Sequence, residues 1–128
     1  MQDPDPVGDI CAAVGEPIIL AVVAAFYRRV AEDGVLRPLY PDENLAAAEQ
    51  RLADFLVGRF GGSDRYVQAR GHPRLRMRHA PFAVDRAARD RWMELMAAAL
   101  DEATFPEPAR ARVLQFLDGV ATFLVNRE

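Results

Sequence analysis

The sequence contains no lysine, and all 16 of its basic residues are arginine. Against 19 acidic residues they leave a formal net charge of −3, so no general basic field favours nucleic acid or an anionic membrane. Arginine suits the recognition of carboxylates and phosphates, but its uniform use along the chain is explained more simply by GC-rich coding. We therefore expect no nucleic-acid partner and no membrane insertion.

Cysteine is almost as scarce. Cys11 is the only one, which excludes an internal disulfide and favours a reducing compartment. The longest apolar run, Pro17–Tyr27, is too short to span a bilayer, and the residues at the start of the chain are acidic, unlike a secretory signal. These features predict a cytoplasmic protein.

A sustained alternation of apolar and polar residues, which is typical of strands, is also missing. Apolar residues recur instead at helical spacing, in segments separated by prolines and glycines. The chain is therefore predicted to be all-α and to form a single domain over residues 1–128, with residues 1–7 frayed. The expected segments are a short helix at Gly8–Val14, helices at Pro17–Asp33 and Asn44–Phe60, a helical turn at Val35–Leu39, a helix from Asp85 to about Glu102, and a last helix after it.

Three helix starts have capping signals. Asn44 and Asp85 are candidate N-caps, and Thr104 with Glu107 matches a capping box that would open the last helix.

Both histidines of the chain lie in the segment Arg70–Phe82, which reads RGHPRLRMRHAPF. Pro73 suits the first position of a short helix, and Pro81 prevents much continuation, so His79 would lie at the helix end, four residues after Leu75. The chain has no cysteine pair and no H-E-x-x-H motif, so no zinc site is predicted. From these residues alone, His79 is either a structural histidine or a single axial ligand.

This segment resembles the proximal histidine segment of the second group of truncated haemoglobins. Further anchors of the resemblance, which runs from about Ile10 to Asn126, are Phe26-Tyr27, Leu39-Tyr40-Pro41, Gly61-Gly62 and Trp92. The resemblance implies a truncated globin-like two-over-two helical sandwich around non-covalent haem b, with His79 as the iron ligand. The Gly-Gly that the family commonly has between its first two helices is Val14-Gly15-Glu16 here, which leaves the path of the first helix open.

Polar aromatic residues are few, and Tyr27, Tyr40 and Trp92 are three of the four tyrosine and tryptophan residues. From sequence alone each is more simply a core residue whose polar tip is satisfied locally. The resemblance instead implies that they line the distal side of the haem. It also matches the usual distal histidine of globins with Ala48, which cannot donate a hydrogen bond, and makes Leu52 the apolar wall one turn later.

Other side chains are expected to contact the haem itself. Arg51 and Arg78 are the best candidates for the two propionates, with Tyr66 as a weaker third. The proximal walls are expected to include Leu75, Met77 and Phe82, and helical phase adds Phe55, Met96 and Leu124, although such a stripe is equally typical of ordinary core.

The resemblance implies reversible binding of oxygen, and of carbon monoxide or nitric oxide, at the haem iron, with slow oxygen release. An alternative is an enzyme, a nitric oxide dioxygenase or a peroxidase-like protein, which shares the same pocket. Because the chain carries no flavin or nicotinamide motif, such catalysis would need an external reductase. A third hypothesis is a haem-free helical interaction module, and a homodimer stays open in each case.

Overall fold

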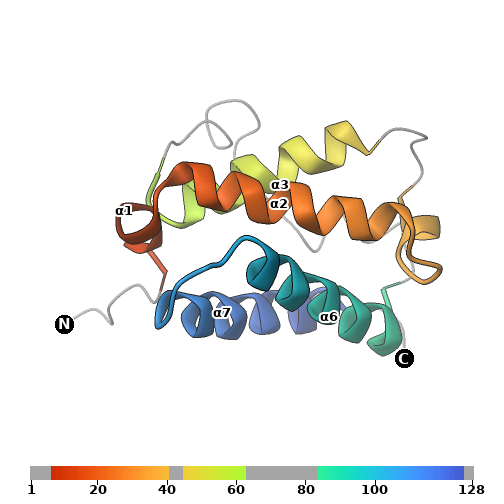
Figure 1. Ribbon diagram of the computed structural model, residues 1–128. Coiled ribbons are helices and arrows are strands. Elements are labelled where there is room, and N and C mark those ends of the chain that lie inside the picture. The colour runs from red at the N-terminus through yellow and green to blue at the C-terminus, as the bar shows by residue number, and fades with distance from the viewer. Residues whose placement is uncertain (1–6, 41–44, 63–83, 126–128) are drawn as a thin grey trace.

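The computed structural model describes residues 7–40, 45–62 and 84–125 (Figure 1). Its α-helices are α1 (Ile10–Val14), α2 (Glu16–Ala31), α3 (Ala46–Arg59), α6 (Arg86–Glu102) and α7 (Ala109–Phe123), and a 3₁₀ turn, η1, covers Arg37–Leu39. Within these ranges no residue is in a strand. The all-α prediction is therefore confirmed, and, apart from the start of α7, the helix boundaries lie within about two residues of the expected ones, as is normal for helix ends.

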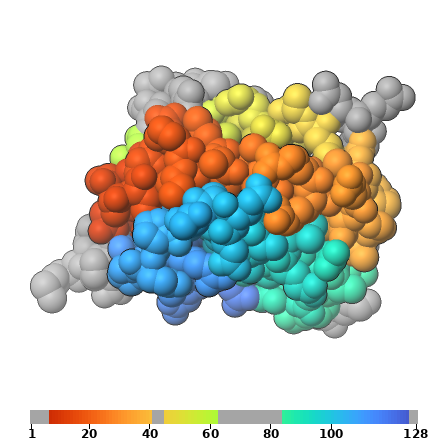
Figure 2. Space-filling view, viewed as in Figure 1, coloured from red at the N-terminus to blue at the C-terminus, as the bar shows by residue number. Residues whose placement is uncertain are grey.

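The helices form two layers. Figure 1 shows α2 with α3 in one layer and α6 with α7 in the other, and the main contacts are of α2 with α3, of α2 with α6, and of α6 with α7. Figure 2 shows α2 and α6 meeting along the face in view. The side chains between the layers form one apolar core, whose largest fully buried members include Phe26, Ile19, Leu56, Met96, Leu100 and Leu117.

Gly61 explains why the Gly-Gly pair follows α3. Its φ is +88°, and an added Cβ would lie 2.0 Å from the carbonyl oxygen of Gly8, so only glycine fits this close approach of two chain segments. A hydrogen bond of 2.8 Å from the Cys11 N–H to the Phe60 carbonyl joins the same segments. The glycine pair therefore attaches the end of α3 to the start of α1, and Gly15, also at a φ of +88°, turns the chain from α1 into α2.

The predicted caps have three different outcomes. Asp85 is confirmed as the N-cap of α6, since its Oδ1 accepts from the Ala88 N–H at 2.8 Å. Asn44 lies outside the described residues, and Leu45 is the N-cap of α3. The capping box of Thr104 and Glu107 is wrong, because α7 begins only at Ala109.

Thr104 instead belongs to the end of α6. Its φ of +57° is left-handed, its N–H donates to the Asp101 carbonyl, and the Phe105 N–H donates back to the Leu100 carbonyl at 3.0 Å. This is the pattern of a left-handed helix ending. Thr104 therefore closes α6, and two prolines separate it from α7.

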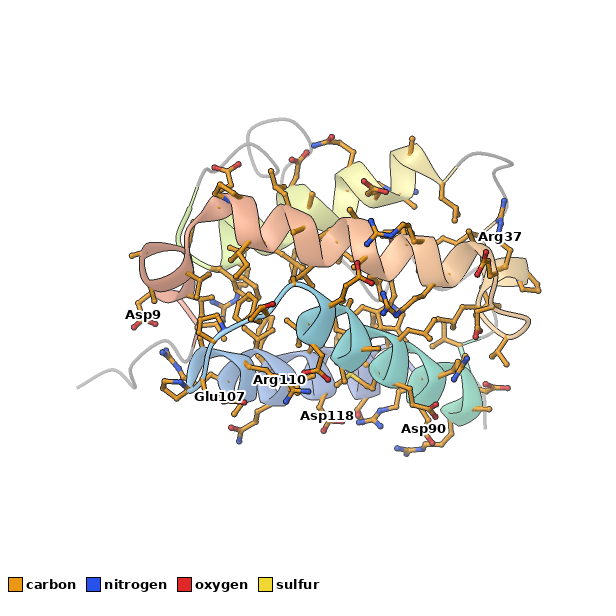
Figure 3. All side chains as sticks on the ribbon, viewed as in Figure 1. Asp9, Arg37, Asp90, Glu107, Arg110 and Asp118 are labelled. Atoms are coloured by element: carbon orange, nitrogen blue, oxygen red, sulfur yellow. The ribbon has the colours of Figure 1, made fainter. Side chains whose placement is uncertain are left out.

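Arginine supplies the ion pairs between helices. Arg110 contacts Asp101 at 2.9 Å and Glu107 at 3.8 Å, and Arg112 contacts Asp9 at 2.6 Å. Figure 3 shows Arg110 and Glu107 close together near the start of α7, and Asp9 beside α1. The carboxylates of these pairs are largely exposed, so each pair contributes only about 0–1 kcal/mol. None of the helices in the described ranges is long and apolar enough to cross a membrane.

Candidate functional site

Three elements bring Tyr27, Tyr40 and Trp92 together. Tyr27 lies near the end of α2, Tyr40 directly follows η1, and Trp92 lies in the first half of α6. The rings of Tyr27 and Tyr40 are 5.7 Å apart between centroids and meet edge to face. Tyr27 is buried, whereas Tyr40 and Trp92 are half-buried against the core. The three side chains that the sequence analysis grouped are thus neighbours in space.

Phe26 supports the group formed by Tyr27, Tyr40 and Trp92. Its ring centroid is 5.1 Å from that of Tyr27 and 5.1 Å from that of Trp92, and the side chain is fully buried. Consecutive aromatic residues on α2 therefore hold Trp92 on one side and Tyr40 on the other, through ring contacts of the edge and tilted kind that aromatic pairs favour. The Phe26-Tyr27 pair was a recognisable signal in the sequence, but the role of Phe26 as a support was not predicted.

Hydrogen bonds within the group converge on the phenol oxygen of Tyr40. The indole N–H of Trp92 can only donate, and it bonds to Tyr40. Tyr27 also bonds to Tyr40, and this bond raises the pKa of Tyr27 and lowers that of Tyr40, as expected when Tyr27 donates. Burial raises the pKa of both phenols and is the largest cause in each case. Both phenols are therefore protonated at neutral pH, and the O–H of Tyr40 is not used in either of these two bonds.

The α3 helix supplies the apolar members of the predicted site. Ala48 is buried, and Leu52 and Phe55 are half-buried side chains packed against the core. Arg51, from the same helix, lies close enough for its positive charge to lower the pKa of both Tyr27 and Tyr40. The structure therefore places this part of α3 beside the phenols.

The packing leaves α3 unlike the other long helices. It packs extensively on α2, but among the described residues it makes no comparably extensive contact with α6 or α7. Leu52 and Phe55 of α3, with Trp92 and Met93 of α6, are nevertheless apolar side chains that stay partly exposed. Met96 is fully buried in the core, and Leu124, at the end of α7, is half-buried. Apolar walls with converging polar groups are typical of a cofactor or ligand site.

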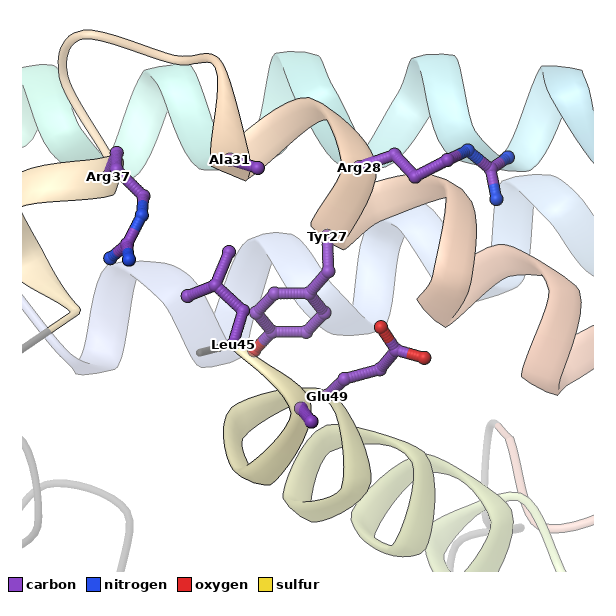
Figure 4. A pocket seen from close by; sticks show the side chains of 7 residues that line it. Tyr27, Arg28, Ala31, Arg37, Leu45 and Glu49 are labelled. Carbon is purple, nitrogen blue, oxygen red and sulfur yellow. The ribbon is translucent and has the colours of Figure 1, made fainter. Parts of the chain in front are cut away.

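A hollow of about 460 Å³ reaches Tyr27 from the outer surface, between the end of α2 and the start of α3 (Figure 4). In Figure 4 the Tyr27 hydroxyl points toward α3, and Leu45 and Glu49 lie beside the ring. This hollow could not be predicted from the sequence, because its walls come from helices whose relative placement only the fold provides.

Six predicted site residues lie outside the described part of the chain. They are the expected iron ligand His79 and the expected haem contacts Tyr66, Leu75, Met77, Arg78 and Phe82. Their roles stay predictions.

Comparison with known proteins gives consistent results. A family model described as bacterial-like globin matches residues 11–126. A group 2 truncated hemoglobin of Bacillus subtilis is 32% identical over 115 residues, covering 90% of this chain and 86% of its own. Among solved structures, the hemoglobin of Chloroflexus aurantiacus has a TM-score of 0.86 at 42% identity, covering 98% of this chain and all of its own. The hemoglobin of Thermobifida fusca has a TM-score of 0.84 at 43% identity, covering 88% of this chain and 91% of its own.

The two-layer helical fold and these neighbours define the class, which is the two-over-two globins. The chain belongs to the bacterial-like globin family and, within it, to the second group of truncated haemoglobins.

Its cofactor is iron haem, and its ligands are small gases such as oxygen. The described residues fit this group, since partly exposed apolar side chains of α3 and α6 accompany phenol and indole donors in the same region.

Proposed function

We propose that the protein binds oxygen reversibly and releases it slowly, with His79 as the ligand of the haem iron. Haem supplies an iron atom with an open axial position for a diatomic ligand. The observation that carries the proposal is the convergence of Tyr27 and Trp92 on the hydroxyl of Tyr40. Slow release needs a fixed hydrogen-bond donor near the ligand, and we propose that this arrangement supplies it.

The proposed donor is the O–H of Tyr40. Its oxygen accepts from Tyr27 and from Trp92, so its proton is directed elsewhere and its rotation is restricted. A donor oriented in advance loses little entropy when a ligand arrives. Trp92 is proposed to act as a second donor when its single N–H turns from Tyr40 to the ligand, and Tyr27 acts behind Tyr40. Ala48 cannot replace them, because its side chain has no donor.

The remaining predicted residues complete the proposal. Leu52 forms the apolar wall on the α3 side, with further contacts from Phe55, Met96 and Leu124. Arg51 and Arg78 are proposed to bind the propionates, with help from Tyr66, and Leu75, Met77 and Phe82 to line the proximal side. A solved structure from Bacillus subtilis that is 31% identical to this chain, and is described as a truncated oxygen-avid haemoglobin, supports the oxygen assignment.

The test combines spectra with ligand release. The purified holoprotein should give haem absorption spectra in the oxidised, reduced and carbon monoxide-bound forms that are typical of axial histidine. Tyr40→Phe should speed oxygen release by about tenfold or more, since a hydrogen bond worth about 1.4 kcal/mol is lost. Tyr27→Phe also removes a phenol hydroxyl, but this hydroxyl is proposed to bond to Tyr40 and not to the ligand, so its effect on oxygen release should be smaller.

Two results would contradict the proposal. Equal rates of oxygen release in wild type and Tyr40→Phe would show that the Tyr40 hydroxyl is not the donor to the ligand. Turnover of nitric oxide with a reducing system, at rates far above autoxidation, would show that the function is nitric oxide dioxygenation and not reversible oxygen binding.

A further inference from the structure

A buried carboxylate lies outside the aromatic group, at the end of α2. Asp33 is only 7% exposed, although it is charged. Its Oδ2 accepts from the N–H groups of Val35 and Leu36, at 3.1 and 2.9 Å, and its Oδ1 accepts from Nε of Arg91 at 2.6 Å. A buried charge is tolerated only when such partners satisfy it, so this carboxylate has a defined structural role.

The backbone side of Asp33 shapes the turn that leads to Tyr40. The carboxylate holds the two amides before η1, and the Asp33 carbonyl accepts from the Arg37 N–H at 3.0 Å. Leu36 is buried, and Tyr40 follows η1 directly, with its N–H bonded to the Arg37 carbonyl. The position of the Tyr40 ring therefore depends on the turn that Asp33 organises.

The arginine side of Asp33 leads to Trp92. Arg91 precedes Trp92 on α6, and its guanidinium also contacts Glu94 at 2.9 Å. These contacts form a closed series of interactions. Asp33 binds Arg91, and Arg91 is followed on α6 by Trp92. The Trp92 indole donates to Tyr40, which η1 connects back to Asp33. The backbone hydrogen bond from Leu36, followed by the contact with Arg91, keeps the pKa of Asp33 below its usual value, so the carboxylate is charged at neutral pH.

We propose that the Asp33–Arg91 ion pair is a positioning device of the distal site, which holds the turn carrying Tyr40 at a fixed distance from the helix carrying Trp92. This inference rests on the proposed function of these two donors. In this inference the ion pair affects ligand release only by placing Tyr40 and Trp92. The pair itself need not contact haem or ligand.

The chain offers a matched control. Arg29 also joins α2 to α6, through a contact of 2.7 Å with Glu102, to which Arg28 is paired as well. This second ion pair lies about three helical turns further along α6 from Trp92 and does not involve η1. Arg29→Gln therefore breaks an ion pair between the same two helices without affecting the turn before Tyr40.

The experiment uses the holoprotein, the single variants Arg91→Gln, Asp33→Asn and Arg29→Gln, and the double variant Asp33→Asn with Arg91→Gln. Arg91→Gln keeps the carboxylate that holds the turn, and Asp33→Asn keeps an oxygen acceptor but loses the charge. Because Trp92 is the only tryptophan, its indole N–H gives a single nitrogen-15 NMR signal in the diamagnetic carbon monoxide form. Oxygen dissociation is measured by stopped flow, and stability by thermal unfolding.

We expect Arg91→Gln and Asp33→Asn to shift the indole signal and to speed oxygen release by about threefold or more, with the double variant changing little further. Arg29→Gln should leave both observables unchanged. The inference is overturned if the two variants lower stability but leave the indole signal and oxygen release as in wild type. If Tyr40→Phe leaves release unchanged, the proposed function fails, and the indole signal alone then decides whether the pair positions Trp92.

Discussion

Replacing Trp92 with phenylalanine tests the distal site most directly. The change deletes the indole N–H, which donates to Tyr40, and keeps an aromatic ring against Phe26, whose centroid is 5.1 Å away. A hydrogen bond contributes about 0.5–1.5 kcal/mol with a neutral acceptor and about 1.5–3 kcal/mol with a charged one. Stability should therefore change modestly, and the main effect should be on the ligand.

The magnitude follows from the hydrogen bond. Oxygen is polar when bound, so the loss of a donor beside it should weaken the complex by about 1.4 kcal/mol or more, which is a factor of ten. We expect Trp92→Phe to raise the oxygen dissociation rate roughly tenfold or more. Carbon monoxide is less polar when bound and should show a smaller change in its dissociation rate.

Stopped-flow dissociation of both ligands provides the measurement. The double variant Trp92→Phe with Tyr40→Phe separates a direct effect from one transmitted through Tyr40. Donors that act independently add their effects, whereas a smaller combined effect shows that Trp92 works partly through the phenol. An oxygen dissociation rate that changes by less than about twofold would refute the reasoning and make Trp92 an ordinary core residue.

Three further predictions concern other parts of the protein. His79→Ala should abolish stable haem binding or leave haem that added imidazole restores, and an unchanged absorption spectrum would contradict the assignment. Arg51→Ala and Arg78→Ala should each speed haem transfer to an apoglobin acceptor while leaving the iron spectrum nearly unchanged, because an exposed pair contributes about 0–1 kcal/mol. Gly61→Ala should lower the free energy of unfolding by about 2 kcal/mol or more, given its φ of +88° and the 2.0 Å clash, whereas Gly119→Ala, in open space within α7, should be neutral or stabilising in the same thermal unfolding assay.

Local signals in the sequence were sufficient for the helices. The helical spacing of apolar residues predicted α2, α3, α6 and α7, and Asp85 marked the start of α6 because an N-cap depends on its own side chain and the next turn. The capping box at Thr104 failed for a physical reason. Thr104 takes a left-handed conformation that ends α6, and the same residue type can serve either helix end according to the backbone.

The candidate site depended on more than local pattern. The family resemblance grouped Tyr27, Tyr40 and Trp92, but residue spacing alone favoured three separate core positions. Only the tertiary structure brings their polar tips together, since the hydrogen bonds join α2, η1 and α6. The roles of His79 and the proximal residues are still predictions from the resemblance.

By itself, the sequence determined the properties that act over a few residues: helical periodicity, the N-cap of α6 and the glycines after α3. Its single cysteine also excluded an internal disulfide. The tertiary structure decided what depends on residues far apart in the chain. Asp33 and Arg91 are 58 positions apart, and nothing near either residue in the sequence indicates the pair. Their contact exists because α2 packs across α6, and the burial of Asp33 in that packing requires a partner for its charge.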